Sequence, residues 1–166
     1  MINLNSGYLN VLNVKNIPIR LHWTLPIGCL IIGGLNPLTW FLFCFILFIH
    51  EGGHAFLAYR RGFQVKSIDL WGMGGMCRWS GLPSQKDMSV IAWGGVIAQT
   101  CVLVVMGLVV LLFGYPAGGI LGLIIYWLVK INIFIIIFNL IPIRPLDGYE
   151  AWKLLKEWKN DMTTKG

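Results

Sequence analysis

The sequence predicts an all-α polytopic membrane protein with about four transmembrane helices. Of its 166 residues, 57% are hydrophobic and 12% are charged, and the mean hydropathy is +0.72. These values lie far outside the range of soluble domains. Uncharged runs cover residues 23–49, 88–129 and 131–143, and a helix needs about 20 apolar residues to cross a hydrocarbon core of about 30 Å. One intramembrane domain is therefore expected over residues 1–166.

The hydrophobic runs divide into four expected spans, at residues 19–34, 38–59, 88–113 and 120–139. The first span is the shortest, and Leu25-Pro26 interrupts it. Residues 33–37 contain two glycines and a proline. This composition favours a tight turn into the second span rather than a linker.

Two further elements are expected outside the spans. Residues 68–80 alternate bulky side chains with Gly72, Gly74 and Gly75, a pattern typical of a short strand or re-entrant hairpin. Such a loop could line a functional site and hold an extended substrate segment by main-chain pairing. Residues 148–159 place apolar side chains near one helical face with lysines around them. This pattern predicts either a helix at the membrane interface or an ordinary helical tail.

The distribution of basic residues predicts the topology. Residues 33–37 and 114–119 carry no charge, whereas nearly all lysines and arginines lie before the first span, in the loop 59–87, or after the fourth span. The positive-inside rule then places both termini and this loop in the cytoplasm. We expect a multi-pass protein of a prokaryotic cell membrane. The net charge of +6 follows from this arrangement and requires no nucleic-acid partner.

The residues that indicate chemistry are His50-Glu51-Gly52-Gly53-His54, an H-E-x-x-H pattern inside the second expected span. On a helix the two histidines lie one turn apart on one face and can bind one Zn²⁺, with the glutamate beside a zinc-bound water. Ionisable groups inside an apolar span are costly and indicate function. Histidines bonded merely to neighbouring helices would leave the glutamate unexplained.

A catalytic zinc site usually needs a third protein ligand. The candidates are His22, Asp69, Asp87 and Asp147. Asp147 is favoured because Pro142 and Pro145 break the helix before it, and broken backbone at membrane depth is tolerated only beside protein or a cavity. The alternative role for Asp147 is the N-cap of a helix over residues 148–159. His22 beside Trp23 is more typical of an interfacial anchor.

Lys130 lies near the middle of the fourth expected span. An intramembrane lysine can indicate a functional site. On a continuous helix, however, it lies about 200° around from Asn132 and points elsewhere. Snorkelling or pairing with backbone carbonyls is the alternative interpretation.

Two motifs together resemble the paired signature of the site-2 protease family of intramembrane zinc metalloproteases. One is H-E-x-G-H in the second span, and the other is N-x-x-P-x-x-x-L-D-G at residues 139–148. Residues 17–22 and 68–75 are also similar to the family's first-helix and glycine-loop segments, and Asn132 adds to the match. The resemblance therefore covers most of the chain.

The resemblance implies that His50, His54 and Asp147 bind one Zn²⁺ per chain. It also implies that Glu51 is the catalytic base and that Asn139 is an active-site polar group close to the substrate. The chain departs from the family where many members have G-P-x-x-N, because it has Gly-Val-Ile-Ala-Gln at residues 95–99. No PDZ or CBS domain is expected.

The expected function is that of a zinc-dependent intramembrane endopeptidase acting in regulated intramembrane proteolysis. Its partners would be the lipid bilayer and a membrane protein substrate cut in or near a transmembrane segment. A non-catalytic membrane scaffold and a proton-coupled transporter of similar topology are the alternatives. A scaffold would not need an intact Glu51 and Asp147, and a transporter would not bind stoichiometric zinc.

Overall fold

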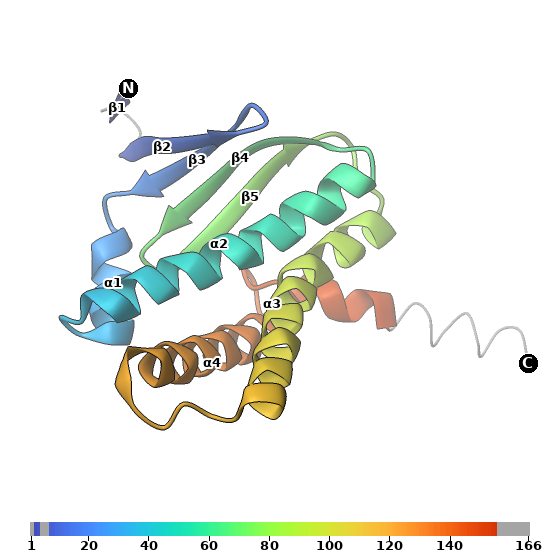
Figure 1. Cartoon of the computed structure of the whole chain (residues 1–166). Helices are drawn as coiled ribbons and strands as arrows, with labels where there is room; N and C mark the ends of the chain where they lie inside the picture. The colour runs from blue at the N-terminus through green and yellow to red at the C-terminus, as the bar shows by residue number, and fades with distance from the viewer. Residues whose placement is uncertain (1, 4–6, 156–166) are drawn as a thin grey trace, which may run out of the picture.

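The computed structural model describes residues 2–3 and 7–155, which form helices on one side of a small sheet (Figure 1). The helices are α1 (Leu25–Gly33), α2 (Pro37–Arg60), α3 (Gln85–Phe113) and α4 (Gly119–Asn139). Helical backbone also covers residues 148–155. The strands are β1 (Ile2–Asn3), β2 (Tyr8–Val14), β3 (Ile17–His22), β4 (Gln64–Trp71) and β5 (Gly74–Ser80).

The five strands form one sheet in the order β1-β2-β3-β4-β5, so β5 is an edge strand. Strands β3 and β4 pair in parallel, and the other neighbours pair antiparallel. The sheet runs alongside α2 (Figure 1). The all-α expectation is therefore corrected. The predicted hairpin at residues 68–80 is present as parts of β4 and β5, but it belongs to a larger sheet built with the N-terminal residues.

The two faces of the sheet explain why residues 17–22 form a strand. Ile19 and Ile68 pair in register and are buried in the hydrophobic core shared with α2. On the opposite face, Arg20 Nε lies 2.6 Å from an oxygen of the fully buried Asp69. Arg78 Nε lies 2.7 Å from the other oxygen. The carboxylate is thus held between two guanidinium groups, which ties β3, β4 and β5 together.

The expected first span at residues 19–34 is not a spanning helix. Its first part belongs to β3, and its second part is α1, a helix of nine residues. Nine residues extend about 13 Å, less than half of a hydrocarbon core. Proline at the start of α1 and Gly34 at its end, with φ of 56°, limit the helix to this length.

Three helices of the described chain are long and apolar enough to cross a membrane, namely α2, α3 and α4. They contain the expected spans 38–59, 88–113 and 120–139. Helices α2 and α3 touch backbone to backbone, because a side chain on Gly53 or on Gly94 would collide with the other residue's carbonyl group. This close approach brings the H-E-x-x-H turn of α2 against α3.

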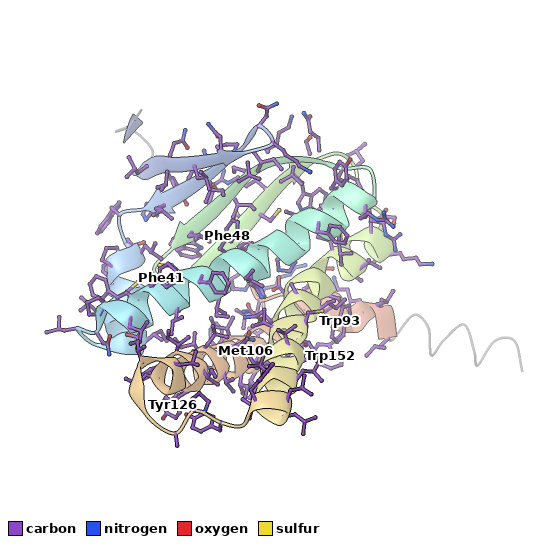
Figure 2. All side chains as sticks on the ribbon, in the orientation of Figure 1. Phe41, Phe48, Trp93, Met106, Tyr126 and Trp152 are labelled. Atoms are coloured by element: carbon purple, nitrogen blue, oxygen red, sulfur yellow. The ribbon has the colours of Figure 1, made fainter. Side chains whose placement is uncertain are left out.

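The chain reverses after α4 and returns beside α3 (Figure 2). Two tryptophans fix the returning segment. Trp93 Nε1 donates to the carbonyl of Ala151 at 3.0 Å, and Trp152 Nε1 donates to the carbonyl of Leu140 at 2.7 Å. Their rings meet edge to face with centroids 5.6 Å apart. The predicted helix 148–159 is therefore helical as far as residue 155, and residues 156–159 lie outside the described residues.

Candidate metal centre

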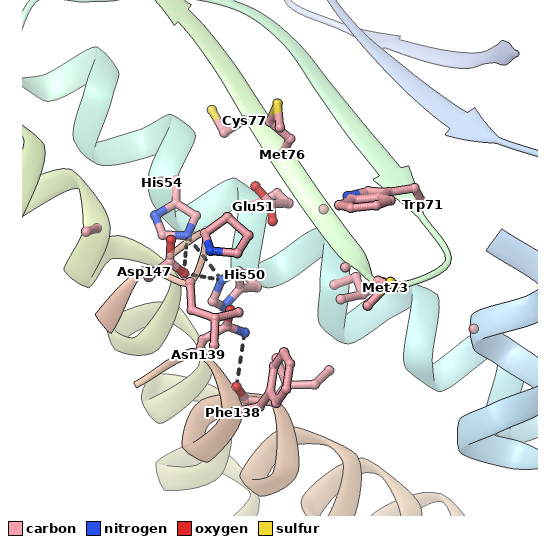
Figure 3. A pocket seen from close by; sticks show the side chains of 18 of the residues that line it. His50, Glu51, His54, Trp71, Met73, Met76, Cys77, Phe138, Asn139 and Asp147 are labelled. Carbon is pink, nitrogen blue, oxygen red and sulfur yellow. Dashed lines mark hydrogen bonds and ion pairs between the residues drawn. The ribbon is translucent and has the colours of Figure 1, made fainter. Parts of the chain in front are cut away.

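Two histidines of α2 meet an aspartate from a distant part of the sequence (Figure 3). His50 and His54 lie one helical turn apart, and their Nε2 atoms are separated by 3.1 Å. Asp147 Oδ2 lies 2.9 Å from His50 Nε2 and 3.1 Å from His54 Nε2. Both histidines are buried, with 3% and 6% of their surface exposed. The three predicted metal ligands are thus brought together.

The outer ring nitrogen of each histidine lies within hydrogen-bond distance of an oxygen atom. His50 Nδ1 lies 2.9 Å from Gln99 Oε1, and His54 Nδ1 lies 2.7 Å from the carbonyl oxygen of Ile91. Each Nδ1 must therefore carry the proton and donate it. When the rings are neutral, both Nε2 atoms present lone pairs toward Asp147, as a metal-binding histidine requires.

When both rings are neutral, the lone pairs of two imidazoles and a carboxylate repel one another at these distances, and a cation among them would remove this repulsion. A proton on one Nε2 would satisfy only part of the cluster, whereas a metal ion would satisfy all three donors. Ligands at the corners of a zinc tetrahedron are about 3.3 Å apart, given bonds of about 2.0 Å, which is close to the spacing of 2.9–3.1 Å found here. The donor set therefore fits Zn²⁺, which these three residues would hold.

Asp147 combines the two roles that the sequence left open. Its backbone carbonyl accepts hydrogen bonds from the amides of Glu150 and Ala151 and begins the helix at residues 148–155. Its side chain turns toward the histidines. Burial would raise the pKa of Asp147, but the hydrogen bonds and positive charge of protonated His50 and His54 outweigh burial and hold the pKa well below its usual range. The side chain is therefore ionised at neutral pH.

Glu51 lies beside the histidine pair on the side that faces β5 (Figure 3). It is 4% exposed. A side chain on Gly75 would collide with the Glu51 carboxylate, so the glycine lets the edge strand approach the acid closely. Cys77 on the same strand is not in the group of possible metal ligands found among the described residues. Burial, followed by the charges of Glu51 and Asp69, raises the pKa of its thiol to about 12.

A cavity of about 630 Å³ opens onto the three donors and Glu51. Its walls come from α1, the β4–β5 hairpin, the end of α4 and residues 144–147, and they are mostly apolar. Asn139 lies in the wall, with Nδ2 donating to the carbonyl of Ile135 at 3.0 Å. The position of Asn139 next to the donors agrees with a contact to substrate, although its amide now bonds its own helix.

The other sequence candidates lie elsewhere. His22 Nδ1 is 2.8 Å from Thr24 Oγ1, and its ring packs between Tyr8 and Trp23. Asp69 is held by the two arginines of the sheet. Lys130 is on the exposed side of α4. None of these residues belongs to the group of possible metal ligands found among the described residues.

Gln99 is the residue of the site that sequence reasoning missed. The sequence showed it only as a departure from G-P-x-x-N, although a glutamine in an apolar span is itself a signal of a buried polar contact. It is fully buried, and its backbone carbonyl accepts from Asn132 Nδ2 at 2.9 Å. Gly95, one turn earlier, leaves room for the His50 ring, because a side chain there would collide with it. Helix α3 thus positions His50.

Replacing Gln99 by Leu is expected to weaken zinc binding by about 10- to 100-fold, the usual effect of losing an outer hydrogen bond to a metal ligand. Gln99→Glu keeps an acceptor oxygen and should restore most of the affinity. Competition with a chelator measures the change. Thr100→Val is the control, because Thr100 is exposed and bonds the carbonyl of Val96 in its own helix. Equal affinities for Gln99→Leu and Thr100→Val would contradict the role of Gln99.

Comparisons with known proteins are consistent with this geometry. A zinc metalloprotease of Methanocaldococcus jannaschii is 28% identical over 157 residues, which cover 84% of this chain and 43% of that protein. Rip3 of Mycobacterium tuberculosis, a proposed zinc metalloprotease, is 34% identical over 104 residues, or 61% of this chain and 26% of that protein. No family model matches the chain.

The chain spans less than half the length of these relatives. Among solved structures, a site-2 protease from Methanocaldococcus jannaschii superimposes with a TM-score of 0.72 and 25% identity. The superposition covers 92% of this chain and 73% of that one. The shared fold, the similar sequences and the paired motifs support the site-2 protease family for this chain.

Proposed function

We propose that this chain is a zinc-dependent intramembrane endopeptidase that hydrolyses peptide bonds in or near transmembrane segments of membrane proteins. The observation that carries the proposal is the meeting of His50, His54 and Asp147 beside Glu51, within a cavity bordered by an apolar helix long enough to span a membrane. The apolar helix beside the cavity supports this substrate class, because a cavity at membrane depth would be reached by a segment of a membrane protein. We assign the cleavage to regulated intramembrane proteolysis.

The proposed chemistry divides among four side chains. His50, His54 and Asp147 would bind one Zn²⁺. When bound, the ion would polarise the scissile carbonyl group and lower the pKa of water to roughly 7. Glu51 takes a proton from the attacking water and passes it to the departing amine. Its burial and its place beside rather than among the three donors suit a base better than a ligand.

The edge strand β5 is the proposed binding site for the substrate. A transmembrane helix hides its peptide bonds, so hydrolysis requires a locally unwound segment. The outer edge of β5 is free to pair with such a segment, because β5 has β4 on one side only. Gly75 brings this edge up to Glu51. An extended substrate paired with β5 would therefore lie next to the base and the metal donors, with Asn139 on the opposite wall.

The orientation in the membrane is inferred from the basic residues. With α2, α3 and α4 as the spans, the loop between α2 and α3 and the end of α4 lie on one side, and residues 114–118 lie on the other. Lysines and arginines gather on the first side, which we assign to the cytoplasm. Strand β3 and α1 together extend about 33 Å, enough to return the N-terminus to the same side. A cysteine at position 116 should react with an external membrane-impermeant thiol reagent.

The function is tested with purified protein in detergent. Elemental analysis should find one zinc per chain, and a fluorogenic transmembrane peptide should be cut in a reaction that a chelator stops and zinc restores. A transporter or scaffold would give protein without stoichiometric zinc or without cleavage. Wild-type protein that contains no zinc after purification without chelators would overturn the proposal.

A further inference from the structure

A lysine lies near the middle of α4, on the exposed side of the helix. Lys130 is the only charged residue of this helix, and it is the twelfth of its 21 residues. Its side chain is exposed. Its Nζ lies 4.8 Å from the centre of the Trp127 ring and 5.5 Å from that of Tyr126. No ion pair to Lys130 occurs within residues 2–3 and 7–155.

The positive charge of Lys130 is only partly balanced by the groups around it. Two aromatic faces on one side of an ammonium group attract it, but the remaining sides face the surroundings of α4. A lysine at mid-span is costly unless it is paired or reaches the interface. Its Nζ turns back by about one helical turn toward Trp127 and Tyr126, which still leaves it well inside a core of about 30 Å. Phospholipid headgroups do not reach this depth.

A second copy of the chain cannot supply the missing negative charge. The acidic residues in the three candidate spans are Glu51 and Asp87. Glu51 is buried beside the histidines. Asp87 lies in the first turn of α3, where it accepts from Ser84 and pairs with Arg61 at 3.1 Å. We therefore take a different membrane protein as the source of the complementary acid.

The face that carries Lys130 continues into the catalytic cavity. Phe134 follows one turn after Lys130, and Phe138 one turn after Phe134; their rings stack with centroids 6.1 Å apart. Both phenylalanines line the cavity, and both remain more than a third exposed. A transmembrane segment that reaches the cavity along α4 therefore passes the two phenylalanines and then Lys130. Lys130 lies about 12 Å along the helix from Phe138, at 1.5 Å per residue.

We propose that Lys130, with Tyr126 and Trp127, is a recognition site for substrates whose transmembrane segment carries an aspartate or glutamate about two helical turns outside the cleavage region. The acid would pair with the ammonium group in a low-dielectric setting, where a charge pair also orients the bound helix. This site would select substrates and set which bond reaches Glu51. The inference rests on the proposed function, since it names the substrate class of that same cavity.

The test uses a Glu51→Gln background, which binds without cutting, in lipid nanodiscs. The probes are two 25-residue leucine-alanine peptides with a Gly-Gly pair near the cytoplasmic end and either Glu or Gln eight residues farther out. The Glu peptide should bind about tenfold tighter or better, and Lys130→Met should abolish this preference. Lys130→Glu should instead prefer a peptide with Lys at that position. Lys86→Met is the control, because Lys86 is an exposed lysine in the first turn of α3.

Equal binding of the Glu and Gln peptides, or a preference that survives Lys130→Met, would overturn the inference and leave Lys130 as a snorkelling anchor. Loss of the preference in Lys86→Met as well would also overturn it, because any surface lysine would then suffice. Cleavage by protein with Glu51 intact separates this failure from that of the proposed function. If only the inference fails, both peptides are cut at equal rates; if the function fails, neither is cut.

Discussion

Glu51→Gln is expected to keep zinc and the fold while losing hydrolysis by about 10²- to 10⁴-fold, the usual contribution of a positioned general base. The substitution is nearly isosteric and removes only the ability to take a proton. Because Glu51 lies outside the group of three donors, the metal content should not change. The measurements are zinc per chain and the cleavage rate of a transmembrane peptide in detergent.

Glu150→Gln is the matched control. Glu150 lines the same cavity, but its carboxylate is already held by Gln85 at 2.8 Å and Lys153 at 2.7 Å. Its replacement should leave the rate within a few fold of wild type. If Glu51→Gln cuts as fast as Glu150→Gln, the base has been wrongly assigned. If it loses its zinc instead, Glu51 is a ligand.

The parts of the site that the sequence predicted well are those encoded locally. His50 and His54 lie on one face because four residues make about one helical turn, and the structure keeps that turn inside α2. Asp147 was predicted as the third ligand because two prolines break the helix after the fourth expected span. Spacing along the chain was sufficient for the histidine pair. The meeting of Asp147 with His50 and His54, which lie 97 and 93 positions away, is the exception and rested on the resemblance to the paired family motifs.

The parts that the sequence did not predict depend on contacts between distant residues. Residues 19–34 were expected to span because they are apolar, yet Ile19 pairs with Ile68 and Arg20 with Asp69, and these partners lie 49 positions away. The contact between Gln99 and His50 joins two helices across the same separation. Hydrophobic periodicity contains no information about such pairings. It therefore gave four spans and an all-α fold in place of three candidate spans and a sheet.

Asp147→Ala is expected to lower zinc affinity by about 100-fold or more, because a direct ligand is worth more than the outer hydrogen bonds that change affinity by 10- to 100-fold. The two histidines alone would leave the metal with two protein ligands. Activity should stay low even when excess zinc restores occupancy, because the ion would no longer be fixed relative to Glu51. Zinc affinity by chelator competition and cleavage at saturating zinc measure the two effects separately.

His22→Ala is the control for this experiment, since His22 was the rival third ligand. Its ring bonds Thr24 and packs against Tyr8 and Trp23, so its loss should leave zinc affinity unchanged. The helix after Asp147 is held through Trp93 and Trp152, independently of the carboxylate, and the fold should survive the Asp147 substitution. Wild-type affinity and normal cleavage in Asp147→Ala would show that the third ligand lies elsewhere and that the cluster seen here is not the metal site.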